Sequence, residues 1–194
     1  MPLRTLAFAA ALAATPFAVS AFEWELDKSH TQILFSVDHL GFSTTNGAFR
    51  EFDATVNLNP ENIEAASVEF VIQTESIDTF WEARDEHVRG SDFLDVANHP
   101  EITFVSTAIE QTGDNTATVT GDLTIRGVTQ EMTFEAELRK LGPNPFDATR
   151  QIAGFHLAGE IDRTEFGVDH FAPAVGAVVP FTVDLELGAA ADAS

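Results

Sequence analysis

The sequence contains no cysteine and no tyrosine, and it has few basic residues. Without cysteine, the 194-residue chain can form no disulfide, no thiolate metal site, no cysteine nucleophile and no lipid-modified N-terminal cysteine. Lysine and arginine total 10 against 31 aspartates and glutamates, so the net charge is −21 at pH 7. This charge repels nucleic acid and anionic lipid headgroups, and we expect no nucleic-acid partner.

Long apolar runs are missing after the first residues, and none approaches the roughly 20 residues of a membrane-spanning helix. We therefore expect no stable membrane insertion, although transient contact with a membrane or a membrane protein stays open. Residues 1–21 carry one charge, an apolar run and the small residues Val19-Ser20-Ala21. This pattern predicts a signal peptide cleaved near Ala21, and hence a periplasmic or secreted protein.

Enzyme signatures are also absent: the sequence has no G-x-S-x-G, H-E-x-x-H, Walker or G-x-G-x-x-G pattern. None of its six histidines pairs with another at a spacing typical of a zinc site. We predict no catalytic residue, no metal and no cofactor. The alternative is a composite metal-dependent or acid/base site built from His39, Asp85 and His87.

Most of the chain alternates apolar and polar residues with a period of two, which is typical of strands with one buried face. In Thr129–Arg139, for example, Phe134 and its apolar neighbours oppose a row of glutamates. Turn residues separate these segments, so we predict an all-β, antiparallel barrel of about eight strands. A sandwich also fits, but closure removes sheet edges. The expected strands cover residues 31–38, 49–58, 66–74, 117–125, 129–139, 150–161 and 178–187, with another from 101, and the expected turns include 41–47 and 142–145.

The segment Ser76–Phe104 interrupts this pattern. Ser76 or Asp78 can cap a helix that begins with Phe80 and ends at Gly90. A second short helical piece is expected over residues 91–98. The segment is therefore predicted to be a helical cap over one end of the barrel.

Phenylalanine occurs 17 times, which indicates a dry interior because it brings no hydroxyl that needs a partner. The rings either fill a core or line a channel for one apolar ligand, as in lipocalins. Periodicity alone leaves both possibilities open.

Motifs along the chain resemble the YceI-like family of periplasmic polyisoprenoid-binding, lipocalin-like proteins. They cover nearly the whole chain after residue 21. They are Asp27-x-x-His30, His39-x-Gly41, Ser76-Ile77-Asp78-Thr79, Arg84-Asp85-x-His87, Asp92-Phe93-Leu94-Asp95-Val96, the run from Gly121 to Thr129, and Arg163-x-x-Phe166-Gly167.

The resemblance implies one YceI-like domain over residues 22–188, a flexible tail over 189–194, and no enzymatic activity. It implies a tunnel that holds a polyprenyl chain, a quinone or a related amphiphile, for transport or sequestration. Phe80-Trp81 departs from the small or polar pair common in the family, and we expect both rings to face the ligand. The predicted tunnel residues are Phe35, Val37, Phe49, Phe70, Ile72, Phe80, Trp81, Phe93, Phe104, Leu123, Phe134, Phe155 and Phe181.

The mouth is predicted to be polar, and we expect Arg84 and Arg163 to pair with Asp78, Asp85 or Asp162. With so few basic residues, a weakly charged headgroup is favoured over a pyrophosphate. The oligomeric state stays open, with a homodimer as one option. A stress-response module that acts through its surface is a further alternative. The predicted mouth residues are His39, Asp78, Arg84, Asp85, His87 and Arg163.

Overall fold

The computed structural model describes residues 22–190, so the predicted signal peptide lies outside the described residues. Strands dominate the described part, which contains one α-helix, α1 (Glu82–Arg89). Short 3-10 turns cover Ile63–Ala65, Thr74–Ser76 and Arg163–Phe166. The strands are β1 (Phe22–Leu26), β2 (Gln32–His39), β3 (Ser43–Phe49), β4 (Phe52–Leu58), β5 (Ser67–Gln73), β6 (Ile77–Asp78), β7 (Glu101–Gln111), β8 (Thr116–Ile125), β9 (Val128–Asn144), β10 (Asp147–Asp162) and β11 (Val178–Ala190).

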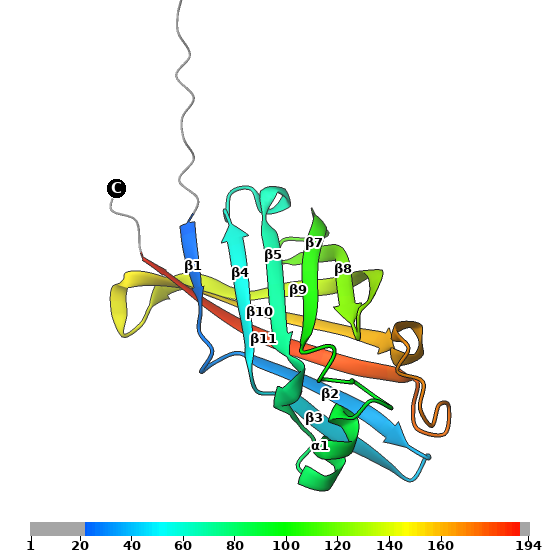
Figure 1. The fold of residues 1–194 in the computed structure, drawn as a ribbon. Helices are drawn as coiled ribbons and strands as arrows, with labels where there is room; N and C mark the ends of the chain where they lie inside the picture. The colour runs from blue at the N-terminus through cyan, green and yellow to red at the C-terminus, as the bar shows by residue number, and fades with distance from the viewer. Residues whose placement is uncertain (1–21, 191–194) are drawn as a thin grey trace, which may run out of the picture.

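The strands form one antiparallel sheet that closes into a barrel. Its order is β1-β4-β5-β7-β8-β9-β10-β11, and β1 pairs with β11 to complete the ring of eight. The predicted fold class is therefore confirmed. Helix α1 lies near one end of the barrel, whereas the start of β1 and the end of β11 lie away from it (Figure 1).

Three of the eight strand positions are interrupted. β1 and β2 are two pieces of one position, and both pair with β11. β3 and β4 form the second interrupted position, where Arg50 and Glu51 separate them. At the third position, β6 follows β5 after a 3-10 turn. The second halves, β2, β3 and β6, pair with one another and extend beside α1 (Figure 1). At the end of the barrel near α1, the wall therefore continues through β2, β3 and β6.

The expected turn over residues 41–47 and the single strand over 49–58 are both wrong. Gly41 does turn, with a positive φ of 72°, but β3 begins at Ser43. Gly47 lies in β3 opposite Phe35, and a Cβ there would be 2.3 Å from Phe35 Cζ. Gly47 is thus a packing glycine, which sequence patterns do not distinguish from a turn glycine.

The long strands run further than predicted. β9 continues to Asn144 and β10 begins at Asp147, so the expected loop over residues 142–145 is mostly strand. β11 extends to Ala190, and Ala189 pairs with Gln151. The predicted flexible tail therefore begins inside a strand, and residues 191–194 lie outside the described part. β1 was not predicted, although its residues alternate in the same way.

The cap contains one helix instead of two. Phe80 has a positive φ of 67°, which excludes it from a right-handed helix, and Trp81 takes the N-cap position. Residues 91–98 form turns, and Asp95 also has a positive φ. Gly90 is the C-cap, as predicted. Among the described residues, no helix is long and apolar enough to cross a membrane.

The buried apolar residues form two clusters. One, around Leu94, Leu123 and Phe166, lies towards the cap. The other, around Trp24 and Leu187, lies where β1 meets β11. Trp24 Nε1 donates a hydrogen bond to the carbonyl of Leu58 at 3.0 Å. Members of both clusters, such as Leu123 and Leu187, face the space inside the barrel.

Candidate ligand-binding site

A cavity of about 500 Å³ runs through the barrel. Its lining reaches from His87 of α1 to Leu58, Ile63 and Leu187 away from the cap. The strand period explains which residues face it: Val68, Phe70 and Ile72 of β5 line the cavity, because alternate side chains point to the same face. The volume falls within the range of small-molecule sites, roughly 300–1,000 Å³.

The lining is almost entirely apolar. None of the described residues that line it is an aspartate or a glutamate, although the chain has 31 of them. A carboxylate in such surroundings would be desolvated without a partner. The interior is therefore suited to an apolar ligand, and its polar groups gather at the end under α1. The polar lining residues are His39, Thr45, Thr79, Arg84, His87 and Arg163.

All but two of the predicted tunnel residues line this cavity. Several pack ring against ring: Phe134 meets Phe181 edge to face at 5.0 Å, and Phe35 lies 5.6 Å from Phe49 between centroids. Other lining residues, such as Leu157 two positions after Phe155, were missed although the same alternation marks them. The predicted residues that line the cavity are Phe35, Val37, Phe49, Phe70, Ile72, Phe93, Phe104, Leu123, Phe134, Phe155 and Phe181.

Neither Phe80 nor Trp81 lines this cavity, but Trp81 borders a smaller pocket at the mouth together with His39, Arg84 and His87. The exposed fractions of Phe80 and Trp81 are 70% and 63%. The Asp78 side chain accepts a hydrogen bond from the Phe80 amide at 2.8 Å, in a local turn that precedes the helix. Trp81 packs under the guanidinium of Arg84, whose Cζ is 5.7 Å from the ring centroid. The Phe80 ring therefore lies away from the cavity, whereas Trp81 lies at the mouth.

Arg163 is a buried anchor, and the expected carboxylate pair is wrong. Its guanidinium donates to the carbonyls of Gly176 at 2.9 Å, Val175 at 2.8 Å and His170 at 3.1 Å, and also to that of Val168. Burial lowers the pKa of Arg163, partly offset by nearby carboxylates. The residue thus holds the loop between β10 and β11 against the barrel.

Thr79, which the sequence analysis did not single out, connects Arg84 and Asp85. Buried Asp85 accepts hydrogen bonds from the Thr79 amide at 2.8 Å and its hydroxyl at 2.5 Å. Arg84 donates to the Thr79 hydroxyl at 2.8 Å and its carbonyl at 2.6 Å. Arg84 therefore binds Thr79 instead of the expected carboxylate. Its Nη1 has no hydrogen-bond partner within residues 22–190.

Asp78 does not line the cavity either. It pairs with Arg50 at 2.7 Å, and its pKa is lowered by the Phe80 amide first and by Arg50 second. His39 and His87 do lie together, along with Thr45, at the mouth. Asp85 is turned towards Thr79, so the three residues of the hypothetical enzyme site are not brought together.

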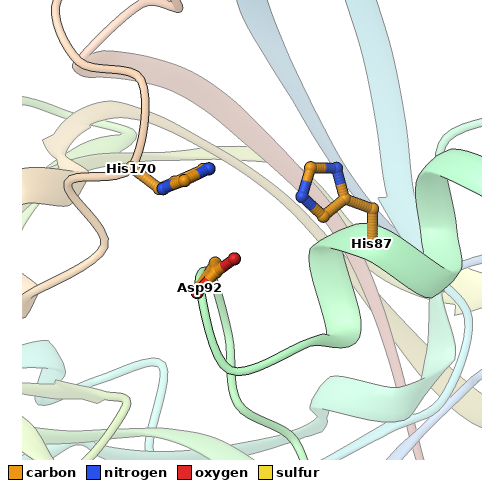
Figure 2. Close-up of side chains that lie close together, drawn as sticks. All are labelled: His87, Asp92 and His170. Atoms are coloured by element: carbon orange, nitrogen blue, oxygen red, sulfur yellow. The ribbon is translucent and has the colours of Figure 1, made fainter.

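Two groups of side chains place possible metal ligands within 4.8 Å of one another: Asp27, His30 and Glu186, and His87, Asp92 and His170. In the first, His30 Nδ1 lies 2.9 Å from Asp27, whose pKa is lowered to about 2 by Ser29 and His30. The second lies at the mouth and joins side chains from separate segments (Figure 2). Neither Asp92 nor His170 was predicted as a site residue. They lie in two loops far apart in the sequence, and no motif spacing indicates that these loops meet.

Comparison with known proteins identifies similar chains over most of the sequence. The model of the YceI-like domain family matches residues 24–189. The chain is 39% identical to Protein YceI of Salmonella agona (strain SL483) over 163 residues, which are 83% of each protein. It is 38% identical to Protein YceI of Escherichia coli O17:K52:H18 over 168 residues, 86% of each.

Solved structures also resemble the barrel, as two examples show. Burkholderia cenocepacia BcnA has a TM-score of 0.75 and 26% identity, and the match covers 84% of this chain and 99% of BcnA. A domain from Saccharophagus degradans, described as polyisoprenoid binding, has a TM-score of 0.65 over 87% of this chain and 99% of that domain. Its identity of 15% shows a shared fold alone.

Proposed function

The chain belongs to the YceI-like family, and on that basis we propose that its barrel binds one amphiphilic isoprenoid lipid, of the polyprenyl or quinone type. The role would be transport or sequestration. The observation that carries the proposal is the apolar cavity of about 500 Å³ with polar groups only under α1. The polyisoprenoid-binding description of the Saccharophagus degradans domain, which shares the fold, supports the ligand class.

The interior offers an apolar chain a surface that needs no hydrogen bonds. Burial of apolar area contributes about 25 cal/mol per Å², so a long chain gains free energy along its whole length. The phenylalanine rings of the wall are rigid and lose little conformational entropy on binding. An amphiphile with its chain in the barrel and its head under α1 matches this distribution of polar and apolar groups.

The mouth favours a headgroup with little charge. A buried pyrophosphate requires several converging cations. Arg163 already donates to four carbonyls, and Arg89 pairs with Glu75 and Glu82. Arg84 offers one nitrogen beside His39 and His87, which suits a quinone carbonyl or an alcohol.

The proposed role is binding without catalysis or a cofactor, in the periplasm or outside the cell. The pattern of residues 1–21 supports export. The Asp85 hydrogen bonds to Thr79 support a structural role for the carboxylate that an acid/base mechanism would need. A module that acts only through its surface would not need the apolar cavity.

A cavity-filling variant tests the proposal. Ala136 lines the cavity from β9, whereas Ala108 is exposed on β7. The protein is incubated with a polyprenol, with a polyprenyl quinone and with a saturated linear alcohol of similar length, and bound lipid is measured after gel filtration. We expect Ala136→Trp to lower isoprenoid affinity at least about tenfold, which is 1.4 kcal/mol, and Ala108→Trp to leave it unchanged.

The linear alcohol separates isoprenoid binding from general lipid binding. Stronger retention of the two isoprenoids supports the proposed ligand class. Equal retention of all three lipids would contradict it, and equal retention by both tryptophan variants would contradict the cavity as the site.

A further inference from the structure

We propose that His87, Asp92 and His170 form a binding site for a divalent transition-metal ion at the mouth of the barrel. One atom of each side chain lies within 4.8 Å of the other two. His87 comes from α1, Asp92 from the turns that follow it, and His170 from the loop between β10 and β11. Figure 2 shows the three side chains converging from these segments.

The spacing is compatible with direct coordination. Bonds of about 2.0–2.2 Å to nitrogen and oxygen place tetrahedral ligand atoms about 3.4 Å apart. His87 and Asp92 are exposed and His170 is half-buried, so each can rotate into this geometry. Coordination therefore requires the ligand atoms, which lie within 4.8 Å of one another, to approach by side-chain rotation.

The three side chains are also available. Among residues 22–190, none of them makes a hydrogen bond or an ion pair. The cluster of Asp27, His30 and Glu186 differs, because His30 lies 2.9 Å from Asp27, which also accepts from Ser29. A metal would have to displace those contacts, whereas at His87, Asp92 and His170 it meets free lone pairs.

Aromatic rings flank the two imidazoles. The Phe93 ring meets His87 edge to face at 5.1 Å and His170 at 5.2 Å, and Phe171 lies 3.8 Å from His170 between centroids. The net charge of −21 raises the local concentration of cations around the site.

Two arginines hold the loops that carry the ligands. Arg126 donates to the carbonyl of Ser91, next to Asp92, at 2.7 Å, and also to the carbonyl of Gly167. Arg163 donates to the carbonyl of His170 itself at 3.1 Å. The loops are thus positioned before any metal arrives, and Arg126 is a positioning residue for the site.

The donor set indicates the class of metal. Two imidazoles with one carboxylate suit Zn²⁺, Fe²⁺, Co²⁺ or Ni²⁺ better than Mg²⁺ or Ca²⁺, which prefer oxygen ligands. Three protein ligands leave a coordination position free. His87, Phe93 and Phe171 also line the cavity, so the site borders it. On the proposed function, a headgroup oxygen could occupy that position, but the metal site itself does not depend on a lipid.

Titration of the tag-free, delipidated protein with Zn²⁺ tests the site, after treatment with a chelator. We expect one equivalent to bind, as measured by calorimetry. His87→Ala and His170→Ala should each weaken binding at least about 100-fold, and Arg126→Met about tenfold, as for groups that orient ligands. Co²⁺ should give a visible absorption band that both histidine variants abolish.

His30→Ala is the matched control, because it removes a histidine from the other cluster. It should leave Zn²⁺ affinity unchanged. Affinity as strong as wild type in His87→Ala or His170→Ala, or a loss confined to His30→Ala, would overturn the proposed site. Isoprenoid binding measured with and without Zn²⁺ then tests the headgroup role separately: tighter binding with metal supports it, and equal binding rejects it.

Discussion

The barrel wall and the barrel mouth position their side chains by different means. In the wall, meaning the cavity-lining residues of the strands, alternation within each strand directs apolar groups inward and no hydrogen bond is needed. In the mouth, meaning residues 79–99 and 163–177 with the turn between β2 and β3, individual hydrogen bonds hold the anchoring side chains in place. Arg163 binds four carbonyls, and Thr79 holds both Arg84 and Asp85.

This difference separates anchors from free groups. A polar side chain in the wall would have no hydrogen-bond partner. The same apolar wall residues therefore stabilise the fold and shape the ligand cavity. In the mouth, Arg163 and Asp85 are anchors with satisfied hydrogen bonds, whereas the imidazoles of His87 and His170 make none within the described residues. Substitutions that change the charge should therefore lower the free energy of unfolding strongly in the wall and at the anchors, and only slightly at the free groups.

The largest effect is expected from Phe134→Asp in the wall. Phe134 is 7% exposed and contacts Phe104 and Phe181, so an aspartate there is desolvated and leaves a cavity. We expect the free energy of unfolding to fall by more than about 4 kcal/mol, and ligand to be lost. Denaturant unfolding measures the effect. Phe146→Asp, at a residue 97% exposed, is the control and should change stability by less than about 0.5 kcal/mol.

Arg163→Met tests whether the mouth depends on its anchors. The substitution keeps much of the volume but leaves one buried and three partly buried carbonyls without this donor, and an unsatisfied buried group costs about 1–3 kcal/mol. We expect a loss of about 3 kcal/mol in unfolding free energy and faster amide exchange in residues 167–177. Arg139→Met, at an exposed ion pair with Asp184, should cost at most about 1 kcal/mol. Equal losses in the two variants would remove the distinction between anchors and surface arginines.

Phe93→Ala and Phe80→Ala compare two cap rings that the sequence analysis treated alike. Phe93 packs against the apolar cluster near the cap and lines the cavity. We expect Phe93→Ala to cost about 2 kcal/mol and to weaken ligand binding, because the ring is partly buried. Phe80→Ala should cost less than about 0.5 kcal/mol, since 70% of the residue is exposed. Weaker ligand binding in Phe80→Ala would instead show that the Phe80 ring contributes to the ligand site.

The smallest effect is expected at the exposed pair Asp27–His30, away from both regions. The Asp27 pKa falls from 3.8 to about 2, so its contribution is present above pH 4 and is lost as the pH falls through about 2. The His30 pKa is raised from 6.5, mainly by Asp27, so that contribution is lost as the pH rises through the raised value. Asp27→Asn should therefore destabilise most between about pH 4 and 6.5.

The size of this effect is at most about 1 kcal/mol, because 37% of the Asp27 side chain is exposed and solvent screens the charge. Thermal unfolding from pH 2 to pH 9 measures it, with Asp114→Asn in an exposed turn as the control. A difference in stability between the wild type and Asp27→Asn that grows below pH 3 would contradict the direction of the Asp27 pKa shift.

The wall could be predicted from the sequence because its information is local. Alternation in residues 129–139 and 66–74 fixed which side chains point inward, and closure followed from the single apolar face of each strand. The interruptions could not be predicted in the same way. Gly47 turns out to lie under the Phe35 ring, and only the pairing of β2 with β3 reveals why a glycine stands there.

The mouth was predicted less well because it depends on backbone conformation and on contacts between distant segments. Phe80 has a positive φ and its ring is mostly exposed, and Trp81 lies at the mouth, whereas the sequence analysis expected both rings in the tunnel. Arg84 and Arg163 were expected to seek carboxylates, but backbone carbonyls and Thr79 surround them. His170 meets His87 only through the fold, since 83 positions separate them in the sequence.

Native mass spectrometry of freshly purified protein tests the central claim most directly, with organic extraction to identify any bound molecule. The predicted result is a complex of one polypeptide and one lipid, whose extracted ligand carries a polyprenyl chain. Spectra that show only the bare polypeptide, before and after incubation with polyprenols and polyprenyl quinones, would contradict the account.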